Sequence, residues 1–382
     1  MAKKVFLFTI ILILFILDNI KAENFVKRNN IQLETRLHYG FLLSHHLELN
    51  RYNSHLPMYE ISIQKLTYGQ KRWEQKYDYP LVGFSLLYSD LGGYKELGNV
   101  YAAFPYLNFP LFRKHESTFN LRLGLGLSWL ENKFDNITNY KNFAIGSHLN
   151  LAASIQFEYR RQINQSFTLT CGTTLTHFSN GTTKTPNYGL NIFTANIAVS
   201  YSLYNPKRSG GRMLLPELYT YEFDGRQYLE MNFVIVVSNK DMTQSVGKRF
   251  MVYASHIDIM KRVSYKSKFG IGIDLTADLS DKYFLDSEGA QANPASYLKT
   301  GISGGYELVI SRMSILTNIG LYVGGKVRKS GDSYQRFTLK YHINENFTTN
   351  LALNTHAGTA DFIGIGLGYR FRFIYKRKIK HS

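Results

Sequence analysis

The sequence is poor in cysteine and proline, with one cysteine and eight prolines among 382 residues. Since Cys171 stands alone, an internal disulfide is excluded and cysteine chemistry indicates nothing about stability. Few prolines beside 28 tyrosines and 26 phenylalanines suit a chain built from strands. No cluster of histidine and carboxylate residues has the spacing of a zinc or calcium site, so we expect neither a metal nor another cofactor.

Long apolar runs are lacking beyond the N-terminus. Residues 5–17 form such a run, after Lys3 and Lys4 and before the small residue Ala22. The pattern is typical of a secretory signal peptide, residues 1–22, and no cysteine near the cut indicates a lipoprotein. The alternative is an uncleaved anchor helix, but the run is shorter than the roughly 20 residues that a spanning helix needs.

Acidic residues are also scarce, since 28 of them face 45 lysines and arginines for a formal net charge of +17. Residues 1–22 carry three lysines and one aspartate, so the chain without them stays strongly basic. Such a charge suits nucleic acid or an anionic lipid surface. Because we expect export, we predict outer-membrane lipids as partners and no nucleic acid.

Alternation with period two is the dominant pattern of the chain. In Leu121–Trp129 every odd position is large and apolar, whereas the even positions are Arg, Gly or Ser. The same alternation returns in 149–159, 269–279 and 363–373. Successive strand residues point to opposite faces, so these segments predict strands with one apolar face and one polar face.

Two architectures produce such strands: a soluble sandwich and a transmembrane barrel with a polar lumen. The strands are roughly 11 to 15 residues long, whereas strands average about 5 to 6 residues and tilted membrane strands need about 9 to 11. Aromatic residues gather at the strand ends, as in a membrane girdle. Asp274 and Asp278 suit a watery lumen better than a sandwich core. We therefore predict an all-β protein, a transmembrane antiparallel β-barrel of the outer membrane.

The alternation predicts about 14 to 16 strands, an even number as bacterial barrels prefer. The candidates are 33–45, 57–66, 80–89, 98–111, 118–131, 147–160, 166–178, 190–203, 226–238, 247–259, 263–279, 295–310, 313–323, 333–343, 346–357 and 360–374. The break at 205–224 contains Pro206 and Pro216 and is either a loop of one wall or a junction between two sheets. It divides a first barrel region, 23–204, from additional barrel strands in 225–382.

The connections indicate the orientation of the first eight strands. With both termini in the periplasm, the hairpins after odd-numbered strands are extracellular. The long connection 131–146 and the short turns 113–117 and 161–166 fit the usual asymmetry of such barrels. The connection 69–79 is longer than a periplasmic turn requires.

A histidine and a serine stand at the outer end of the seventh candidate strand. His177 and Ser179 share the parity of its apolar face, and Asn191 shares the parity of the apolar face of the next strand. We therefore expect all three on the lipid-facing side near the outer leaflet. A histidine two residues from a serine can act as its general base. Plain interfacial polar residues beside a turn are the alternative interpretation.

The hairpin that follows these residues is rich in groups that donate hydrogen bonds. Asn180, Asn187 and the backbone amides around Gly181 are candidate donors to an oxyanion.

Several segments form a specific combination: His177-Phe178-Ser179-Asn180-Gly181, Pro186-Asn187-Tyr188-Gly189-Leu190-Asn191, Trp73 with Tyr79-Pro80-Leu81-Val82-Gly83, Leu97-Gly98, and residues 142–150. Together they resemble the lipid A 3-O-deacylase (PagL), or acyloxyacyl hydrolase, family of outer-membrane barrels. The resemblance covers roughly residues 35 to 204, the counterpart of the short eight-stranded members, and 356–362 near the end resembles longer members.

The resemblance implies a serine hydrolase of the outer membrane that removes an ester-linked acyl chain from the lipid A of lipopolysaccharide. By position, it makes His177 the base, Ser179 the nucleophile and Asn187 an oxyanion-hole donor. The family orients its histidine with a glutamate, and Asn191 stands at that position. No acidic residue occurs in 159–216, and Asp224 and Asp361 are acids farther along the chain. The alternative is a catalytically impaired, porin-like or structural outer-membrane barrel.

Overall fold

The structure is a computed structural model that describes residues 31–203, 208–209, 212–213, 227–242, 247–290, 292–328 and 331–375. The expected signal peptide, 1–22, lies outside these residues. Asp224 and most of the segment 205–224 also lie outside them, and the structure describes only β9 (Arg208–Ser209) and β10 (Arg212–Met213) of that segment.

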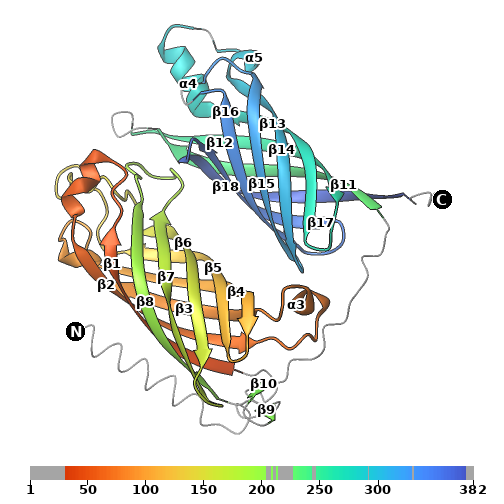
Figure 1. Ribbon diagram of the computed structural model, residues 1–382. Helices are drawn as coiled ribbons and strands as arrows, with labels where there is room; N and C mark the ends of the chain where they lie inside the picture. Colours follow the sequence, from red (N-terminus) through yellow and green to blue (C-terminus); the bar gives the residue numbers. More distant parts are fainter. Residues whose placement is uncertain are drawn as a thin grey trace.

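The first eight long strands close into one antiparallel barrel (Figure 1). Its strands are β1 (Ile31–Leu42), β2 (His55–Leu66), β3 (Leu81–Ser89), β4 (Val100–Lys114), β5 (Ser117–Leu130), β6 (Leu149–Gln162), β7 (Phe167–Ser179) and β8 (Leu190–Ser202). β1 pairs with β8 from Gln32↔Ser202 to Leu42↔Ile192, which completes the wall.

The next eight strands close into a second barrel. These are β11 (Gln227–Asp241), β12 (Arg249–Arg262), β13 (Ser267–Asp278), β14 (Leu298–Ile310), β15 (Met313–Gly324), β16 (Ser333–His342), β17 (Phe347–His356) and β18 (Thr359–Tyr375). The all-β barrel prediction is confirmed, and each of the sixteen expected strands has a counterpart. Their expected place in one wall is corrected, because β1 pairs with β8 and β11 with β18. Each closure satisfies the backbone groups of both edges, so neither barrel offers an edge to the other.

Strand parity places the side chains as the alternation predicts. In β7 and β8 the odd positions face outward and the even positions face the lumen. Ile197 on β8 is 60% exposed, whereas its neighbours Asn196 and Ala198 are buried. Large apolar residues cover the outer faces of both barrels, as the hydrocarbon region of a membrane requires.

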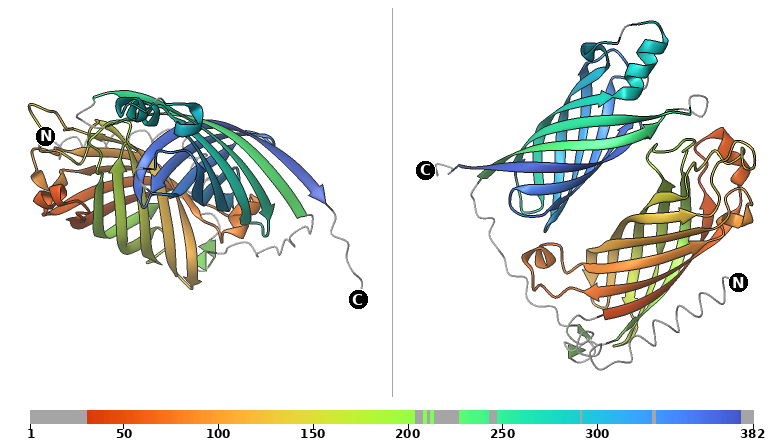
Figure 2. Two further views of the ribbon diagram at one scale, coloured as in Figure 1. Left: turned by 90° about the horizontal axis from the view of Figure 1, so that it is seen from above. Right: turned by 180° about the vertical axis from the view of Figure 1, so that it is seen from behind.

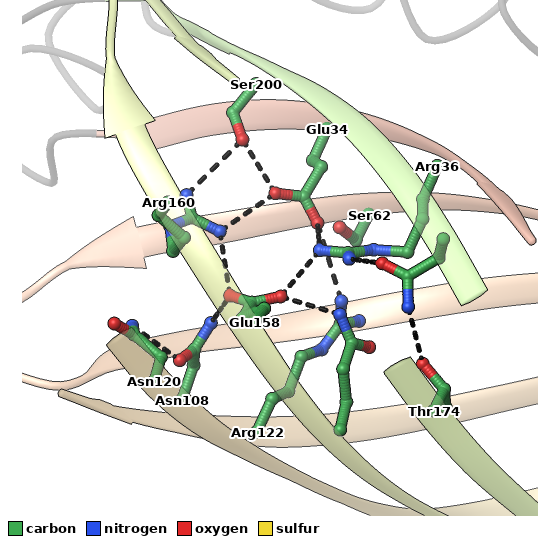
Figure 3. A network of polar contacts seen from close by, with 12 residues as sticks. Glu34, Arg36, Ser62, Asn108, Asn120, Arg122, Glu158, Arg160, Thr174 and Ser200 are labelled. Atoms are coloured by element: carbon green, nitrogen blue, oxygen red, sulfur yellow. Dashed lines mark hydrogen bonds and ion pairs between the residues drawn. The ribbon is translucent and has the colours of Figure 1, made fainter. Parts of the chain in front are cut away.

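The lumen of the first barrel is filled by buried ion pairs (Figure 3). Arg36 binds Glu34 at 2.7 Å and Glu158 at 2.8 Å, and Arg160 binds the same two carboxylates at 3.0 and 3.2 Å. Arg122 completes the network through Glu34 and Glu60. Three guanidinium groups thus balance three carboxylates inside a wall of hydrogen-bonded strands, and the packed side chains occupy the space that a pore would need.

The second lumen is filled in the same manner. Arg336 binds Asp258 at 2.8 Å and Asp274 at 3.1 Å, and Lys268 binds Glu230 at 2.5 Å.

No helix in the described part of the chain is long and apolar enough to cross a membrane.

Apart from the connection between β2 and β3, the connections of both barrels are long at one rim and short at the other. The long rim of the first barrel carries η1 (Leu47–Tyr52), η2 (Leu91–Gly93) and the connections 131–148 and 180–189. That of the second carries α4 (Leu279–Ser287) and α5 (Pro294–Tyr297). This asymmetry is that of outer-membrane barrels, in which the longer loops are extracellular.

The two barrels touch at both rims (Figure 1, Figure 2). At the long rims, the Asp241 amide donates to Thr182 O at 2.9 Å. At the short rims, the connection with α3 (Arg72–Lys76) reaches the second barrel, where the Tyr77 hydroxyl donates to Val309 O at 2.7 Å. Burial raises the pKa of that hydroxyl above its ordinary value. The long rims contact each other and the short rims contact each other, so both barrels point the same way. The unexpected length of 69–79 serves the contact between the short rims.

Candidate active site

The site lies at the outer ends of β7 and β8, where His177 pairs directly with Asn191 across the two strands. Ser179 follows His177 on the same face, and all three side chains are half-buried on the outward parity of their strands. Same-face neighbours of a strand lie within side-chain reach of each other. The structure therefore brings together the three side chains for which the sequence predicts the roles of base, nucleophile and orienting residue.

Hydrogen bonds join the three side chains in a row. His177 Nε2 lies 2.8 Å from Ser179 Oγ, and His177 Nδ1 lies 2.6 Å from Asn191 Oδ1. Both distances lie in the range of a working base and its partners, about 2.6 to 3.2 Å. An amide oxygen can only accept, so the proton of the neutral imidazole sits on Nδ1 and the Nε2 lone pair faces the serine hydroxyl. This is the arrangement that activates a serine.

Asn180 fixes the turn that follows the serine. Its side-chain amide donates to Ser147 Oγ at 2.8 Å and to Lys184 O at 2.9 Å. Its backbone N–H donates to Asn187 Oδ1 at 3.0 Å. Since both donor groups of Asn180 are engaged, this residue holds the turn in place.

Asn187 is held with its amide nitrogen available. Its Oδ1 accepts from Asn180, and within the described residues its Nδ2 group donates to no protein atom. Gly181, in the left-handed region at φ +60°, packs against Ile363 of the second barrel. Its N–H likewise has no acceptor in the described part of the chain. Asn187 and Gly181 thus keep free donors in the turn after Ser179.

The connection between β5 and β6 supports the same hairpin. The amides of Tyr188 and Gly189 donate to Phe143 O at 3.3 Å and Ala144 O at 2.9 Å. Gly189 is required here, because a Cβ on its φ +78° backbone would stand 2.9 Å from His177 Cε1. The segment 142–150 therefore positions the hairpin that carries the site.

Apolar side chains cover the wall below the site. Phe41 on β1 and Phe193 on β8 pair directly, with ring centroids 6.0 Å apart, and both are exposed on the outer face. Leu175 stands one outward position below His177 on β7. A hydrocarbon chain that lies on this wall brings its polar end to the level of Ser179.

Asp361, one of the two acids considered from the sequence, makes its contacts away from His177. The Asp361 carboxylate binds Lys240 Nζ at 2.7 Å in the second barrel, and its backbone oxygen accepts from Thr182 Oγ1. His356 accepts or donates at 3.0 Å to the Tyr322 hydroxyl and stands 4.0 Å from Asp361. Asp224 lies outside the described residues. Among those that are described, no group of three or more His, Cys, Asp or Glu could hold a metal ion.

Sequence reasoning missed His45, which lies just beyond β1. Its Nδ1 is 3.1 Å from Asn191 Nδ2 and its Nε2 is 2.8 Å from Tyr188 O. His45 reaches the site through a long-range pairing. Closure of β1 on β8 sets Leu42 opposite Ile192, and Leu43 N donates to Asn191 O at 2.7 Å. Strand alternation by itself gives no such register.

Solved outer-membrane proteins overlap with the chain at low similarity. A mutant of the Rhodopseudomonas blastica porin is 7% identical, with 90% of this chain and 99% of the porin covered and a TM-score of 0.18. Omp33 of Acinetobacter baumannii is 7% identical, with 90% and 98% covered and a TM-score of 0.17. OccK11 (OpdR) of Pseudomonas aeruginosa is 11% identical, with 91% and 97% covered and a TM-score of 0.19. A search of curated proteins finds no match.

Family models match both barrels. Residues 58–200 match the model of lipid A 3-O-deacylase (PagL), and residues 229–373 match that of the acyloxyacyl hydrolase C-terminal domain. Each match falls within one of the two closed barrels, and together they span most of the chain. The chain therefore belongs to the lipid A 3-O-deacylase (PagL) and acyloxyacyl hydrolase family.

Proposed function

We propose that this protein is an outer-membrane serine esterase that removes an ester-linked acyl chain from the lipid A of lipopolysaccharide. The observation that carries the proposal is the hydrogen-bonded row Ser179–His177–Asn191 on the outward face of the first barrel. An ester that is embedded in the outer leaflet reaches such a face laterally. Family membership supports lipid A deacylation in general, and the residue roles are our assignment.

The first half of the proposed reaction forms an acyl-enzyme. The Ser179 hydroxyl loses its proton to His177 Nε2 while its oxygen attacks the ester carbonyl carbon. The negative charge that develops on the carbonyl oxygen is stabilised by the free donors of Asn187 and the Gly181 amide. The tetrahedral intermediate then collapses, the sugar-side oxygen leaves, and His177 returns the proton to it.

The second half releases the fatty acid. A water molecule gives a proton to His177 Nε2 and attacks the acyl carbon, and Ser179 leaves with that proton. Throughout both halves Asn191 Oδ1 accepts from the Nδ1 side of the ring. An amide oxygen stabilises the imidazolium as a dipole, whereas a glutamate would do so with a full charge.

The basic surplus of the chain suits the phosphorylated head group of this substrate. Lipopolysaccharide is therefore the proposed partner, and the outer membrane is the proposed location. The hydrocarbon of the scissile chain would lie on the wall below the site that includes Leu175, Phe41 and Phe193.

Mass spectrometry of lipid A tests the proposal. Cells that express the protein should lose one ester-linked acyl chain from lipid A, and cells that express Ser179→Ala or His177→Ala should not. Unchanged acylation with the wild-type protein, or activity that survives Ser179→Ala, contradicts it.

A conductance measurement tests the porin-like alternative. Since buried ion pairs fill both lumens, we expect no single-channel conductance in planar bilayers. Stepwise conductance from the purified protein would favour the channel instead.

A further inference from the structure

His45 completes the hydrogen-bonded row at the end opposite to Ser179. The row runs from Tyr188 O to His45 at 2.8 Å, from His45 to Asn191 at 3.1 Å, from Asn191 to His177 at 2.6 Å, and from His177 to Ser179 at 2.8 Å. Two imidazoles and one amide thus stand between a backbone carbonyl and the serine hydroxyl.

The backbone carbonyl at one end fixes the tautomer of His45. Tyr188 O can only accept, so His45 Nε2, at 2.8 Å, must carry the proton. The neutral ring then has a lone pair on Nδ1. The opposite tautomer would set a lone pair against the carbonyl oxygen and leave its Nδ1–H a poor acceptor, Leu43 O at 3.5 Å. His45 is therefore an acceptor toward Asn191.

An acceptor at that place decides how the Asn191 amide is turned. With Nδ2 donating to His45 Nδ1, Oδ1 is the atom that faces His177 Nδ1. Turned by half a rotation, the amide would present Nδ2 to His177, whose Nδ1 would then have to accept. The proton of His177 would move to Nε2, and the ring could not take a proton from Ser179.

A carboxylate does not have this problem, because both of its oxygens accept. In a serine protease, replacement of the triad aspartate by asparagine costs about 10⁴ in turnover, since the histidine adopts the wrong tautomer. An asparagine at the acid position therefore needs a neighbour that keeps its oxygen toward the base.

We infer that His45 is this neighbour: a positioning residue that holds the Asn191 amide with Oδ1 toward His177 and thereby fixes the base in its productive tautomer. The inference rests on the proposed esterase function. It assigns the segment just after β1 a part in the site, through the closure of β1 on β8.

Turnover by matched variants tests the inference. The full-length protein is assayed in detergent micelles with purified hexa-acylated lipid A, and released fatty acid is measured by mass spectrometry. His45→Ala should lower kcat by at least about tenfold with little change in KM, because without an acceptor at position 45 the Asn191 amide turns Nδ2 toward His177 and selects the tautomer that costs a serine protease about 10⁴ in turnover. His45→Gln should retain most activity, since its side chain offers both an acceptor and a donor.

A carboxylate at position 191 provides the decisive control. In the Asn191→Glu background the amide orientation no longer exists, so adding His45→Ala should change kcat by less than about threefold. An equal loss in both backgrounds would mean that His45 supports the loop alone, and would overturn the inference.

A tautomer measurement keeps the two proposals separable. In protein labelled with ¹⁵N-histidine, the His177 signals, assigned by their loss in His177→Gln, should show Nδ1–H in the wild type and a shift toward Nε2–H in His45→Ala. An Nδ1–H tautomer in both proteins overturns the role of His45. An inactive wild-type protein overturns the proposed esterase function, whereas the tautomer of His177 still tests the positioning role of His45.

Discussion

Gly189→Ala is a substitution that moves the proposed base without touching any reactive group. Gly189 lies in the left-handed region at φ +78°, and an added Cβ would stand 2.9 Å from His177 Cε1 and 3.2 Å from Phe178 O. The backbone cannot retreat freely, because the Gly189 amide donates to Ala144 O at 2.9 Å. The imidazole must therefore give way.

The size of the effect follows from these contacts. Ordinary contact begins at 3.4 Å, so the ring must move by about half an ångström. A misplacement of about 1 Å costs roughly 10²-fold in rate, which gives roughly tenfold for this shift. Cε1 lies between the two ring nitrogens, so the bonds to Ser179 and Asn191 both change. The left-handed backbone adds about 1 to 2 kcal/mol of destabilisation.

Gly93→Ala is the matched control. Gly93 has φ +74° in η2 of the same barrel, and an added Cβ meets nothing within 4 Å. The two variants share the backbone cost but differ in the contact with His177. Fatty acid release from lipid A measures turnover, and the heat-modifiable migration of the barrel in gels measures folding. A Gly189→Ala protein that folds and turns over like Gly93→Ala would refute the reasoning.

Three further predictions follow from other contacts of the two barrels. Asn187→Asp keeps the acceptor for the Asn180 amide but removes the side-chain donors. In steady-state assays kcat should therefore fall by about 10² to 10³ with KM nearly unchanged. A wild-type kcat would exclude Asn187 from the oxyanion hole. Asp241→Ala removes the acceptor of the Thr185 amide and hydroxyl at 3.1 and 3.2 Å, so hydrogen exchange of the Thr185 amide should become faster. The control Asp332→Ala, at an exposed pair with Arg328, should leave the exchange rate of the Thr185 amide unchanged. Glu158→Leu removes a buried partner of Arg36 and Arg160 and should lower the free energy of unfolding in denaturant titrations by about 3 to 5 kcal/mol. The control Glu116→Gln, at an exposed position, should lower it by less than about 0.5 kcal/mol. Equal stability of the two variants would show that the lumen network contributes nothing.

The outward position of the site could be predicted from the sequence because it depends on a local rule. Alternation places residues two apart on one face, so His177 and Ser179 go outward with the apolar side chains of their strand. The short hairpin brings Asn191 opposite His177 for the same reason. Strand number, barrel character and the three side chains of the row were therefore predictable.

The number of barrels was not a local property. A strand pattern is the same whether β8 returns to β1 or continues to β11, so sixteen strands fit one wall as well as two. Pairing of β1 with β8 and of β11 with β18 decided the question, because a closed wall satisfies every edge amide and carbonyl. The length of 69–79 likewise became intelligible once Tyr77 was seen against Val309.

The sequence by itself determined the chemistry of the site: a serine, a histidine two residues away, and an asparagine where the family has an acid. Tertiary structure alone decided what surrounds that asparagine. His45 lies 146 residues from Asn191 in sequence and reaches it through the closure of the barrel. Alternation fixes the face of a side chain, whereas register and closure between distant strands fix its neighbours, and the orientation of an amide depends on the neighbours.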